Sequence, residues 1–245
     1  MTRAELPMLA VSQLSRNFGG LAALDGVSFE VARGHTFGLI GPNGSGKTTL
    51  LNLVCGRLSP TRGEIRIAGR PMTGRRPEVM CRAGIAGTFQ LARVPDALDA
   101  RDNVAVAAMY GRRRLDVAAA RAEAERLLVR VGYAGEPSAR ADALAYFDLK
   151  RIELARALAC APDLLLLDEW LAGLNPTELE AGIELVRSLE GDGLTILMVE
   201  HVMHAIRSLC RQVVVLNAGR VIASGTPEEA LADRDVIRVY LGDGL

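Results

Sequence analysis

Residues 41–49 read GPNGSGKTT, which matches the phosphate-binding pattern G-x-x-x-x-G-K-[S/T]. A short apolar run, expected to form a buried strand, precedes this segment at residues 36–40, and the helix-like run TTLLNLVCG covers residues 48–56. Glycines let such a loop turn so that its backbone N–H groups converge on phosphate oxygens, and the helix N-terminus adds a partial positive charge. The segment therefore predicts a nucleotide phosphate site.

Each position of this loop is a candidate nucleotide contact. Lys47 is expected to reach the β- and γ-phosphates of ATP, and the Thr48 hydroxyl is expected to bind Mg²⁺. A glycine-rich turn could match by chance, but only two of the 29 basic residues are lysines, Lys47 and Lys150, and a compact charge is what phosphate requires here. The candidate cofactor-binding residues of the loop are Gly41, Pro42, Asn43, Gly44, Ser45, Gly46, Lys47, Thr48 and Thr49.

Two carboxylates end a second apolar run, LLLLDEW, at residues 164–170. The C-terminal end of a buried strand is the usual place for ligands in an open α/β sheet. Asp168 would hold Mg²⁺, directly or through water, and Glu169 is the natural general base for an attacking water. A solvated acidic turn is the alternative, and the phosphate loop in the same chain disfavours it.

Two further polar residues are weaker candidates when taken alone. Gln90, in the segment GIAGTFQ, could contact Mg²⁺ or the attacking water. His201 ends the apolar run LTILMVEH and could contact the γ-phosphate. A structural role is the commoner expectation for a lone histidine at a strand end.

Composition excludes several classes of function. The 245-residue chain has 29 basic and 29 acidic residues, so no global charge favours nucleic acid, and the basic cluster at 111–116 is interpreted as a solvated helix end. No run approaches the roughly 18 apolar residues of a membrane helix, and the first residues do not form a secretory signal. The four cysteines lack metal-ligand spacing and are expected to be reduced, mostly buried thiols of a cytosolic protein.

The pattern of expected secondary structure changes twice along the chain. Strands and turns fill the first 90 residues, and Ala-rich runs of helical spacing follow, with Leu115, Ala119, Ala122, Arg126 and Val129 tracing one expected stripe. After this insertion, strand-like and helix-like runs alternate, and Pro and Gly bound the expected helix at 176–193. This alternation predicts an α/β fold with a largely parallel, covered sheet.

The ordered set Phe18, GPNGSGKT, Gln90, the stretch 144–151, LLLLDE, AGLNP (172–176) and His201 resembles an ABC-transporter ATP-binding subunit. The resemblance covers essentially the whole chain. The segments NFGGLAALDGVSFEV, GIAGTFQ, DNVAVAA and AGLNPTE, with the tail GRVIASGTPEE, are similar to the branched-chain amino acid importer group, specifically its LivG-type subunit. The resemblance implies a P-loop NTPase core, mostly parallel with an antiparallel β-subdomain, plus an inserted α-helical subdomain.

The resemblance also implies domain bounds, roles and partners. Residues 1–245 would be a single ABC ATPase domain, with a nucleotide-binding core at 1–90 and 148–245 and the helical subdomain at 91–147. Phe18 would stack on adenine, Gln90 would sense the membrane subunit, and His201 would be the switch histidine. Two ATPase subunits would close over two ATP molecules, bound to membrane permease subunits and served indirectly by a periplasmic solute-binding protein. The chain would lie peripherally on the cytoplasmic face of the inner or plasma membrane, with no nucleic-acid partner.

This chain departs from the family at the signature sequence, L-S-[G/Y]-G-Q. Ala145 has no hydroxyl to donate, Phe147 puts a ring where the family has bare backbone, and Asp148 replaces an amide by an anion. Losing one hydrogen bond to a charged group costs about 1.5–3 kcal/mol, and a like charge nearby would add up to about 4 kcal/mol. Because this sequence faces the partner's ATP, a heterodimer with an intact partner signature is favoured.

Other departures leave alternatives open. Trp170 stands where the family has Pro, Val202 where it has Asp, and Gly87 where Arg is frequent. These changes put the full catalytic rate in question, although not nucleotide binding. One alternative function is an ATP-binding regulatory or structural module with little turnover. The other is the ATPase of a lipid or lipopolysaccharide exporter. The sequence of this chain does not identify the transported solute. Urea and amides are alternatives to branched-chain amino acids.

Overall fold

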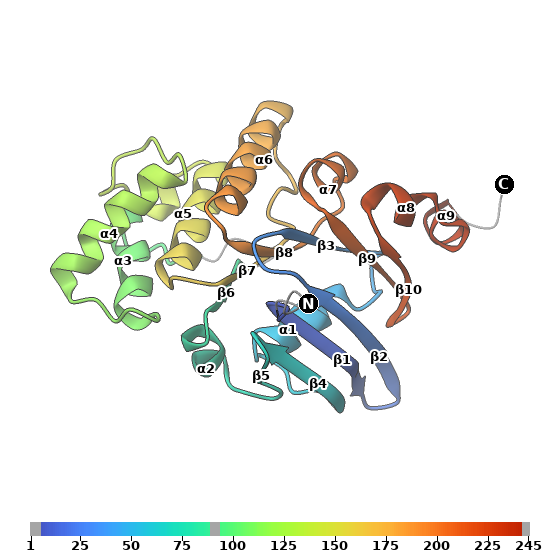
Figure 1. Cartoon of the computed structure of the whole chain (residues 1–245). Coiled ribbons are helices and arrows are strands. Elements are labelled where there is room, and N and C mark those ends of the chain that lie inside the picture. Colours follow the sequence, from blue (N-terminus) through green and yellow to red (C-terminus); the bar gives the residue numbers. More distant parts are fainter. Residues whose placement is uncertain (1–5, 89–93, 242–245) are drawn as a thin grey trace, which may run out of the picture.

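The computed structural model describes residues 6–88 and 94–241, and a six-stranded sheet forms its centre (Figure 1). The strand order is β10 (Arg220–Gly225), β9 (Gln212–Asn217), β3 (Thr36–Ile40), β8 (Thr195–Val199), β7 (Leu164–Asp168) and β6 (Ile85–Gly87). All neighbours pair in parallel except β9 and β10, which form an antiparallel hairpin. Every residue of β3, β7 and β8 is buried, which is why these strands are unbroken apolar runs.

A second, antiparallel sheet packs beside the first. Its order is β2 (Leu21–Val31), β1 (Leu9–Phe18), β4 (Arg62–Ile67) and β5 (Arg70–Pro71). Ile65 and Ile67 both point into the apolar core that this sheet shares with helix α1 (Lys47–Val54), as their spacing predicts. The mostly parallel core with an antiparallel β-subdomain is thereby confirmed.

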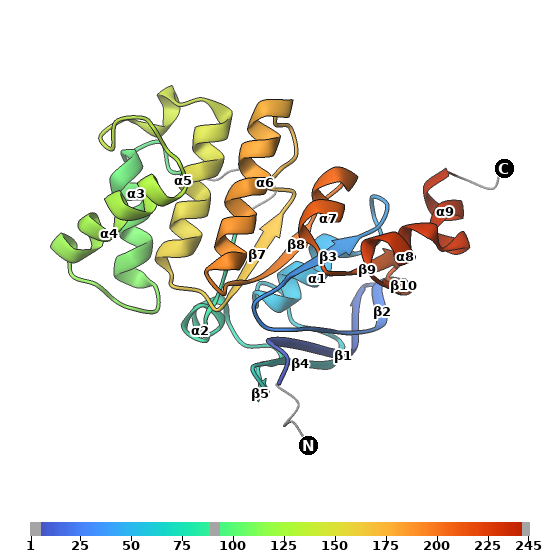
Figure 2. The same ribbon diagram turned by 45° about the horizontal axis from the view of Figure 1, so that its top comes forward.

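Helices form one end of the molecule. Figures 1 and 2 show α3 (Ala100–Tyr110), α4 (Val117–Arg130) and α5 (Tyr146–Ala159) side by side, with α6 (Pro176–Gly191) next to α5. Helix α3 packs against both α4 and α5. A short 3₁₀ turn, Ala141–Ala143, leads into α5. The subdomain limits 91–147 remain a prediction. Helix α5 crosses the upper limit and packs along the inserted helices α3 and α4.

The stripe expected on α4 is wrong. The buried residues are Ala120, Ala124, Leu127 and Leu128, whereas Val129 is 77% exposed. Both faces of this Ala-rich helix have helical spacing, and the face that meets α3 and α5 carries the larger apolar pair. Tertiary packing therefore decided between two similar stripes.

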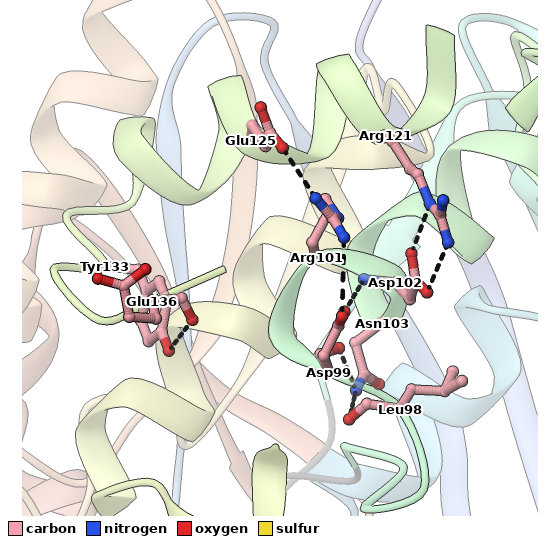
Figure 3. A network of polar contacts seen from close by, with 9 residues as sticks. All are labelled: Leu98, Asp99, Arg101, Asp102, Asn103, Arg121, Glu125, Tyr133 and Glu136. Carbon is pink, nitrogen blue, oxygen red and sulfur yellow. Dashed lines mark hydrogen bonds and ion pairs between the residues drawn. The ribbon is translucent and has the colours of Figure 1, made fainter. Parts of the chain in front are cut away.

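Polar contacts connect the inserted helices (Figure 3). Asp99 caps α3 by accepting from the Asp102 backbone N–H at 2.6 Å. Arg121 of α4 binds both carboxylate oxygens of Asp102, at 2.9 and 3.0 Å. The buried Asn103 amide donates to the carbonyl oxygens of Pro95, Leu98 and Asp99. These contacts fix α3 to the loop before it and to α4.

The remaining helices are α2 (Pro77–Arg82), α7 (Met203–Leu209), α8 (Pro227–Ala232) and α9 (Arg234–Leu241). Helix α2 packs beside the edge strand β6, and α8 and α9 pack beside the edge strand β10, whereas Ile206 of α7 faces Gly38 of the central strand β3. Among the residues that the structure describes, no helix combines the length and apolar character needed to cross a membrane.

Candidate active site

A pocket of about 630 Å³ lies where β1 ends, α1 begins and the parallel strands β7 and β8 end. It brings together side chains that are far apart in sequence. The lining residues are Phe18, Leu21, Ala23, Asn43, Gly44, Ser45, Gly46, Lys47, Thr48, Thr49, Glu169 and His201.

The loop before α1 requires glycine at two positions. Gly41 has a φ of 148°, and a Cβ there would lie 2.1 Å from the Leu216 carbonyl oxygen. Gly46 has a φ of 108°, and a Cβ there would lie 2.7 Å from the Ala23 carbonyl oxygen. Both positions combine left-handed backbone with close approach of another chain segment, so any side chain would displace the loop.

Lys47 is held by the loop itself. Its ammonium donates hydrogen bonds to the carbonyl oxygens of Gly41, at 2.7 Å, and Pro42, at 3.0 Å. Burial lowers the pKa of Lys47, while the carboxylates of Glu169 and Asp168 raise it. Gly41 and Pro42 do not line the pocket and contribute to the site through these carbonyls. The lysine is therefore a buried cation beside two carboxylates.

Asp168 lies behind the pocket wall at the end of β7. It is 8% exposed, and its Oδ1 atom has no hydrogen-bond partner among the described residues. Burial, and secondly the nearby Glu169 carboxylate, raise the pKa of Asp168 to about 6. The Ser45 hydroxyl is likewise buried without a partner in the described ranges. Such orphaned oxygens fit a site that a cation and phosphate groups complete.

Glu169 and His201 form a contact inside the pocket. The His201 Nε2 atom lies 3.0 Å from the Glu169 Oε1 atom. Glu169 has a φ of 51°, and its backbone N–H donates to the Val199 carbonyl oxygen at 2.8 Å. This unusual turn directly after β7 directs the carboxylate into the pocket. The two residues that sequence alone placed on separate strand ends therefore meet at one point.

Phe18 has the exposure of a ligand-stacking ring. It is 44% exposed, it lines the pocket, and the Arg16 guanidinium lies 4.6 Å from its ring centroid. A ring with this exposure is not part of the apolar core. Gln90 lies outside the described residues, so its predicted role stays a prediction.

The side chains of the signature stretch lie at the start of α5, and two of the three replaced residues are held by contacts within the chain. Ala145 is the N-cap of α5 and provides no side-chain hydrogen bond. The Phe147 ring turns inward and packs against Trp170, with ring centroids 6.2 Å apart. Asp148 pairs with Arg151 at 3.1 Å, and the Arg151 guanidinium stacks over Phe147. Arg151 offsets the negative charge of Asp148. The missing hydroxyl at Ala145 is therefore a larger departure at this helix start than the added charge.

Gly87, another departure from the family pattern, has a packing reason. A Cβ at Gly87 would lie 2.8 Å from the Cβ and from the carbonyl oxygen of Leu166 on the adjacent strand β7. A larger side chain would push β6 away from β7.

Among the buried charged residues that the sequence did not predict, two contact the turn that follows β7. Lys150 is 2% exposed and donates to the carbonyl oxygens of Glu169, at 3.1 Å, and Trp170, at 2.8 Å. Glu200 is fully buried and accepts from the Leu171 backbone N–H at 2.6 Å. Burial raises the pKa of Glu200 to about 7. The scarcity of lysine was the available signal for Lys150, and the acidic residue following an all-apolar strand was the signal for Glu200.

Two family models match the sequence. One, described as ABC transporter, matches residues 24–172, which is more than half of the chain. A second, described as branched-chain amino acid ATP-binding cassette transporter, matches residues 220–245. The chain belongs to the ABC transporter family. The resemblance found in the sequence is confirmed, and this ABC protein is an ATPase that binds nucleotide.

Relatives of this ABC ATPase cover nearly its full length. It is 37% identical over 251 residues to the high-affinity branched-chain amino acid transport ATP-binding protein LivG of Salmonella typhimurium, covering 97% of this chain and 98% of LivG. It is 36% identical to the corresponding protein BraF of Pseudomonas aeruginosa, with the same two coverages of 97% and 98%. A crystal structure of a nucleotide-free ATP-binding cassette from an ABC transporter superimposes with a TM-score of 0.87 and 25% identity, covering 97% of this chain and all of that chain.

Proposed function

We propose that this ABC ATPase energises a membrane importer for branched-chain or related amino acids, by binding and hydrolysing ATP with Mg²⁺ in the pocket beside Lys47. The observation that carries the proposal is the meeting of the phosphate loop with the Glu169–His201 contact in one pocket. LivG and BraF, which match almost end to end, and the tail match at residues 220–245 support the solute class.

Each pocket residue has a distinct task in this proposal. Phe18 stacks on the adenine ring, and the loop N–H groups with Lys47 hold the phosphates. Glu169 accepts a proton from the attacking water, and His201, 3.0 Å away, orients that carboxylate and contacts the γ-phosphate. Gln90 adds a contact to Mg²⁺ or to the water.

Thr48 and Asp168 would hold Mg²⁺, which when bound supplies charge stabilisation to the phosphates. Within the described ranges, no group of three His, Cys, Asp or Glu side chains is placed to hold a metal ion. This agrees with Mg²⁺, which usually binds one or two protein ligands together with substrate phosphates.

The second proposal concerns the partner. We infer a heterodimer with another ABC ATPase subunit, because the α5 N-terminus of this chain lacks the hydroxyl cap that would face the partner's ATP. An intact signature from the partner would complete the site built on Lys47. Permease subunits would hold this pair peripherally at the cytoplasmic face of the membrane, and a periplasmic solute-binding protein would act through them.

One experiment tests both proposals. ATP binding and turnover are measured on the purified chain across a range of concentrations, alone and with a partner ATPase subunit that carries an intact L-S-G-G-Q sequence. Binding alone, with turnover on adding the partner, is the expected result. Turnover that rises steeper than linearly with this chain's concentration would overturn the heterodimer. Binding without turnover under both conditions would overturn hydrolysis and support a regulatory module instead.

The solute class needs a separate measurement. Copurification of the tagged chain with its membrane subunits, followed by uptake of labelled leucine into proteoliposomes, is expected to show ATP-dependent import. Export of a lipid by the same assembly would exclude the importer, and uptake of urea or amides without leucine would change the solute.

A further inference from the structure

A second cavity, of about 220 Å³, gathers three of the four cysteines. Cys55 follows α1, Cys81 lies in α2, and Cys160 follows α5. All three are partly exposed, and only Cys210 is buried, so the expectation of mostly buried thiols is wrong. The cavity is separate from the nucleotide pocket, and among the described residues none lines both.

Cys81 and Cys160 both line this cavity. The nearby Cys160 thiol, followed by the positive charge of Arg82, lowers the pKa of Cys81 to about 7 against opposing burial. The Cys81 thiol, followed by burial, raises the pKa of Cys160. The Cys160 sulfur also lies 3.6 Å from the Arg156 carbonyl oxygen. The positive charge of Arg82, next to Cys81 in the chain, favours the thiolate at the Cys81 sulfur.

The other cysteines do not share this setting. Burial raises the pKa of Cys55, whose sulfur lies 3.5 Å from the Asn52 carbonyl oxygen. Burial likewise raises the pKa of Cys210, which does not line this cavity. The charged residues that line the cavity are Arg57, Glu153 and Arg156, and they belong to different elements. The surroundings of Cys81 are therefore net positive, partly exposed and next to a second thiol, the features of an oxidant-sensitive cysteine.

We propose that Cys81 and Cys160 form a redox-active dithiol that hydrogen peroxide, or a hydroperoxide of the same class, converts to a disulfide linking α2 to the end of α5. The Cys81 thiolate attacks one peroxide oxygen, the O–O bond breaks, and hydroxide leaves, so that Cys81 becomes a sulfenic acid. The Cys160 sulfur then attacks the Cys81 sulfur, the S–O bond breaks, and water leaves with the Cys160 proton. Two electrons pass from the two thiols to the peroxide, and the products are one disulfide and two waters.

Disulfide formation between Cys81 and Cys160 depends neither on the identity of the transported solute nor on ATP turnover. It concerns thiols outside the nucleotide pocket, and its readout is a covalent bond. A reducing cytosol returns the pair to thiols, so the disulfide would form only under oxidant exposure.

Peptide mapping of the full chain tests the pair directly. The reduced protein is treated with hydrogen peroxide, remaining thiols are blocked, and the digest is analysed without reduction. The expected result is one Cys81–Cys160 linked peptide that disappears after treatment with dithiothreitol. A digest in which Cys81 stays alkylated at peroxide levels that oxidise Cys55, or in which Cys160 is joined to Cys55 instead, would overturn the proposal.

Two variants separate the roles of the thiols. In Cys160→Ser, peroxide is expected to leave Cys81 as a sulfenic acid that dimedone traps, because the thiol that resolves it has been removed. Cys55→Ser is the matched control and should form the Cys81–Cys160 link as in the wild type. Iodoacetamide should also modify Cys81 at least several-fold faster than Cys55 at neutral pH in the unoxidised protein. Equal rates would remove Cys81 from the role of thiolate.

Discussion

The Lys150 ammonium donates a hydrogen bond of 2.8 Å to the Trp170 carbonyl oxygen, and the Trp170 indole Nε1 donates one of 3.0 Å to the Lys150 carbonyl oxygen. The same ammonium reaches the Glu169 carbonyl oxygen at 3.1 Å. The Phe147 ring packs against the Trp170 ring, tilted by 53°. The start of α5 and the turn that carries Glu169 are therefore one packed unit, and the replaced residues Phe147 and Trp170 accommodate each other.

Lys150→Met is expected to lower ATP turnover at least tenfold and the free energy of unfolding by about 1–3 kcal/mol, because two buried carbonyl oxygens lose their donor. ATP affinity should change less than threefold, since Lys150 does not line the nucleotide pocket. Steady-state turnover with the partner, equilibrium nucleotide binding and chemical denaturation are the measurements. The exposed Arg66→Met serves as the control, and equal losses of binding and turnover in Lys150→Met would contradict a positioning role.

Glu169→Gln is expected to reduce turnover by about 10²- to 10⁴-fold, the range for loss of a general base, while ATP affinity is retained. The variant should accumulate as an ATP-bound dimer with its partner, which size-exclusion chromatography with ATP would detect. Glu180→Gln is the matched control, because Glu180 also contacts a histidine, His204, at 2.9 Å, but on the exposed surface. Unchanged turnover in Glu169→Gln would remove this residue from the role of base.

Lys47→Ala is expected to abolish ATP binding, because the only side-chain cation lining the pocket among the described residues would be lost. The Gly41 and Pro42 carbonyl oxygens would also lose their donor. Titration with a fluorescent ATP analogue measures the effect, and thermal unfolding checks that the loop still folds. Wild-type affinity in this variant would show that the loop backbone alone holds the phosphates.

Glu200 predicts a pH dependence of stability. Its pKa is raised in the folded protein to about 7, so the folded state keeps a proton that the unfolded chain has lost. Its contribution therefore lowers the free energy of unfolding as pH rises from about 4.5 to 7 and is constant above that range. Asp168, whose pKa is raised to about 6, acts with the same sign over a lower range.

Glu200→Gln should remove the loss of stability that the ionisation of Glu200 causes, while keeping an acceptor for the Leu171 backbone N–H. The variant is expected to be more stable than the wild type near pH 8, by roughly 3 kcal/mol at most, and equally stable near pH 4. Urea denaturation at both pH values gives the comparison, with the exposed Glu30→Gln as control. A stability difference that is the same at both pH values would assign the effect to packing.

Much of the fold was readable from the sequence because its signals are local. The strands β3, β7 and β8 are unbroken apolar runs, and the loop between β3 and α1 carries its own pattern of glycines. Helix α6 begins at Pro176 with a capping box between Asn175 and Glu178, as the start and stop residues predict. Such features need no knowledge of distant contacts.

The unpredicted features depend on distant contacts. A lysine in a helix is normally assigned to the surface, and Lys150 is buried because two carbonyl oxygens about 20 positions later accept from it. The inward direction of Phe147 likewise requires Trp170 as its neighbour. The buried face of α4 depends on α3 and α5, since alanine on both faces makes the sequence pattern ambiguous.

Ala145→Ser tests the structural reading of the signature. Ala145 has the extended N-cap conformation, with φ −64° and ψ 154°, and serine there can accept from a backbone N–H in the first turn of α5. The substitution is expected to raise the free energy of unfolding by about 0.5–2 kcal/mol. In the dimer it should also strengthen ATP binding at the site built on the partner's phosphate loop by roughly ten- to hundredfold, the value of one hydrogen bond to a charged group.

The exposed Ala143→Ser is the control for Ala145→Ser, because it adds the same hydroxyl two residues earlier, outside the N-cap. Chemical denaturation of each variant alone separates the capping effect from the ligand effect. Nucleotide titration of the dimer, with the partner's own phosphate-loop lysine left intact and Lys47 replaced by alanine in this chain, isolates the opposite site. A gain in stability without any gain in ATP affinity there would mean that Phe147 and Asp148, and not the missing hydroxyl, keep that site weak.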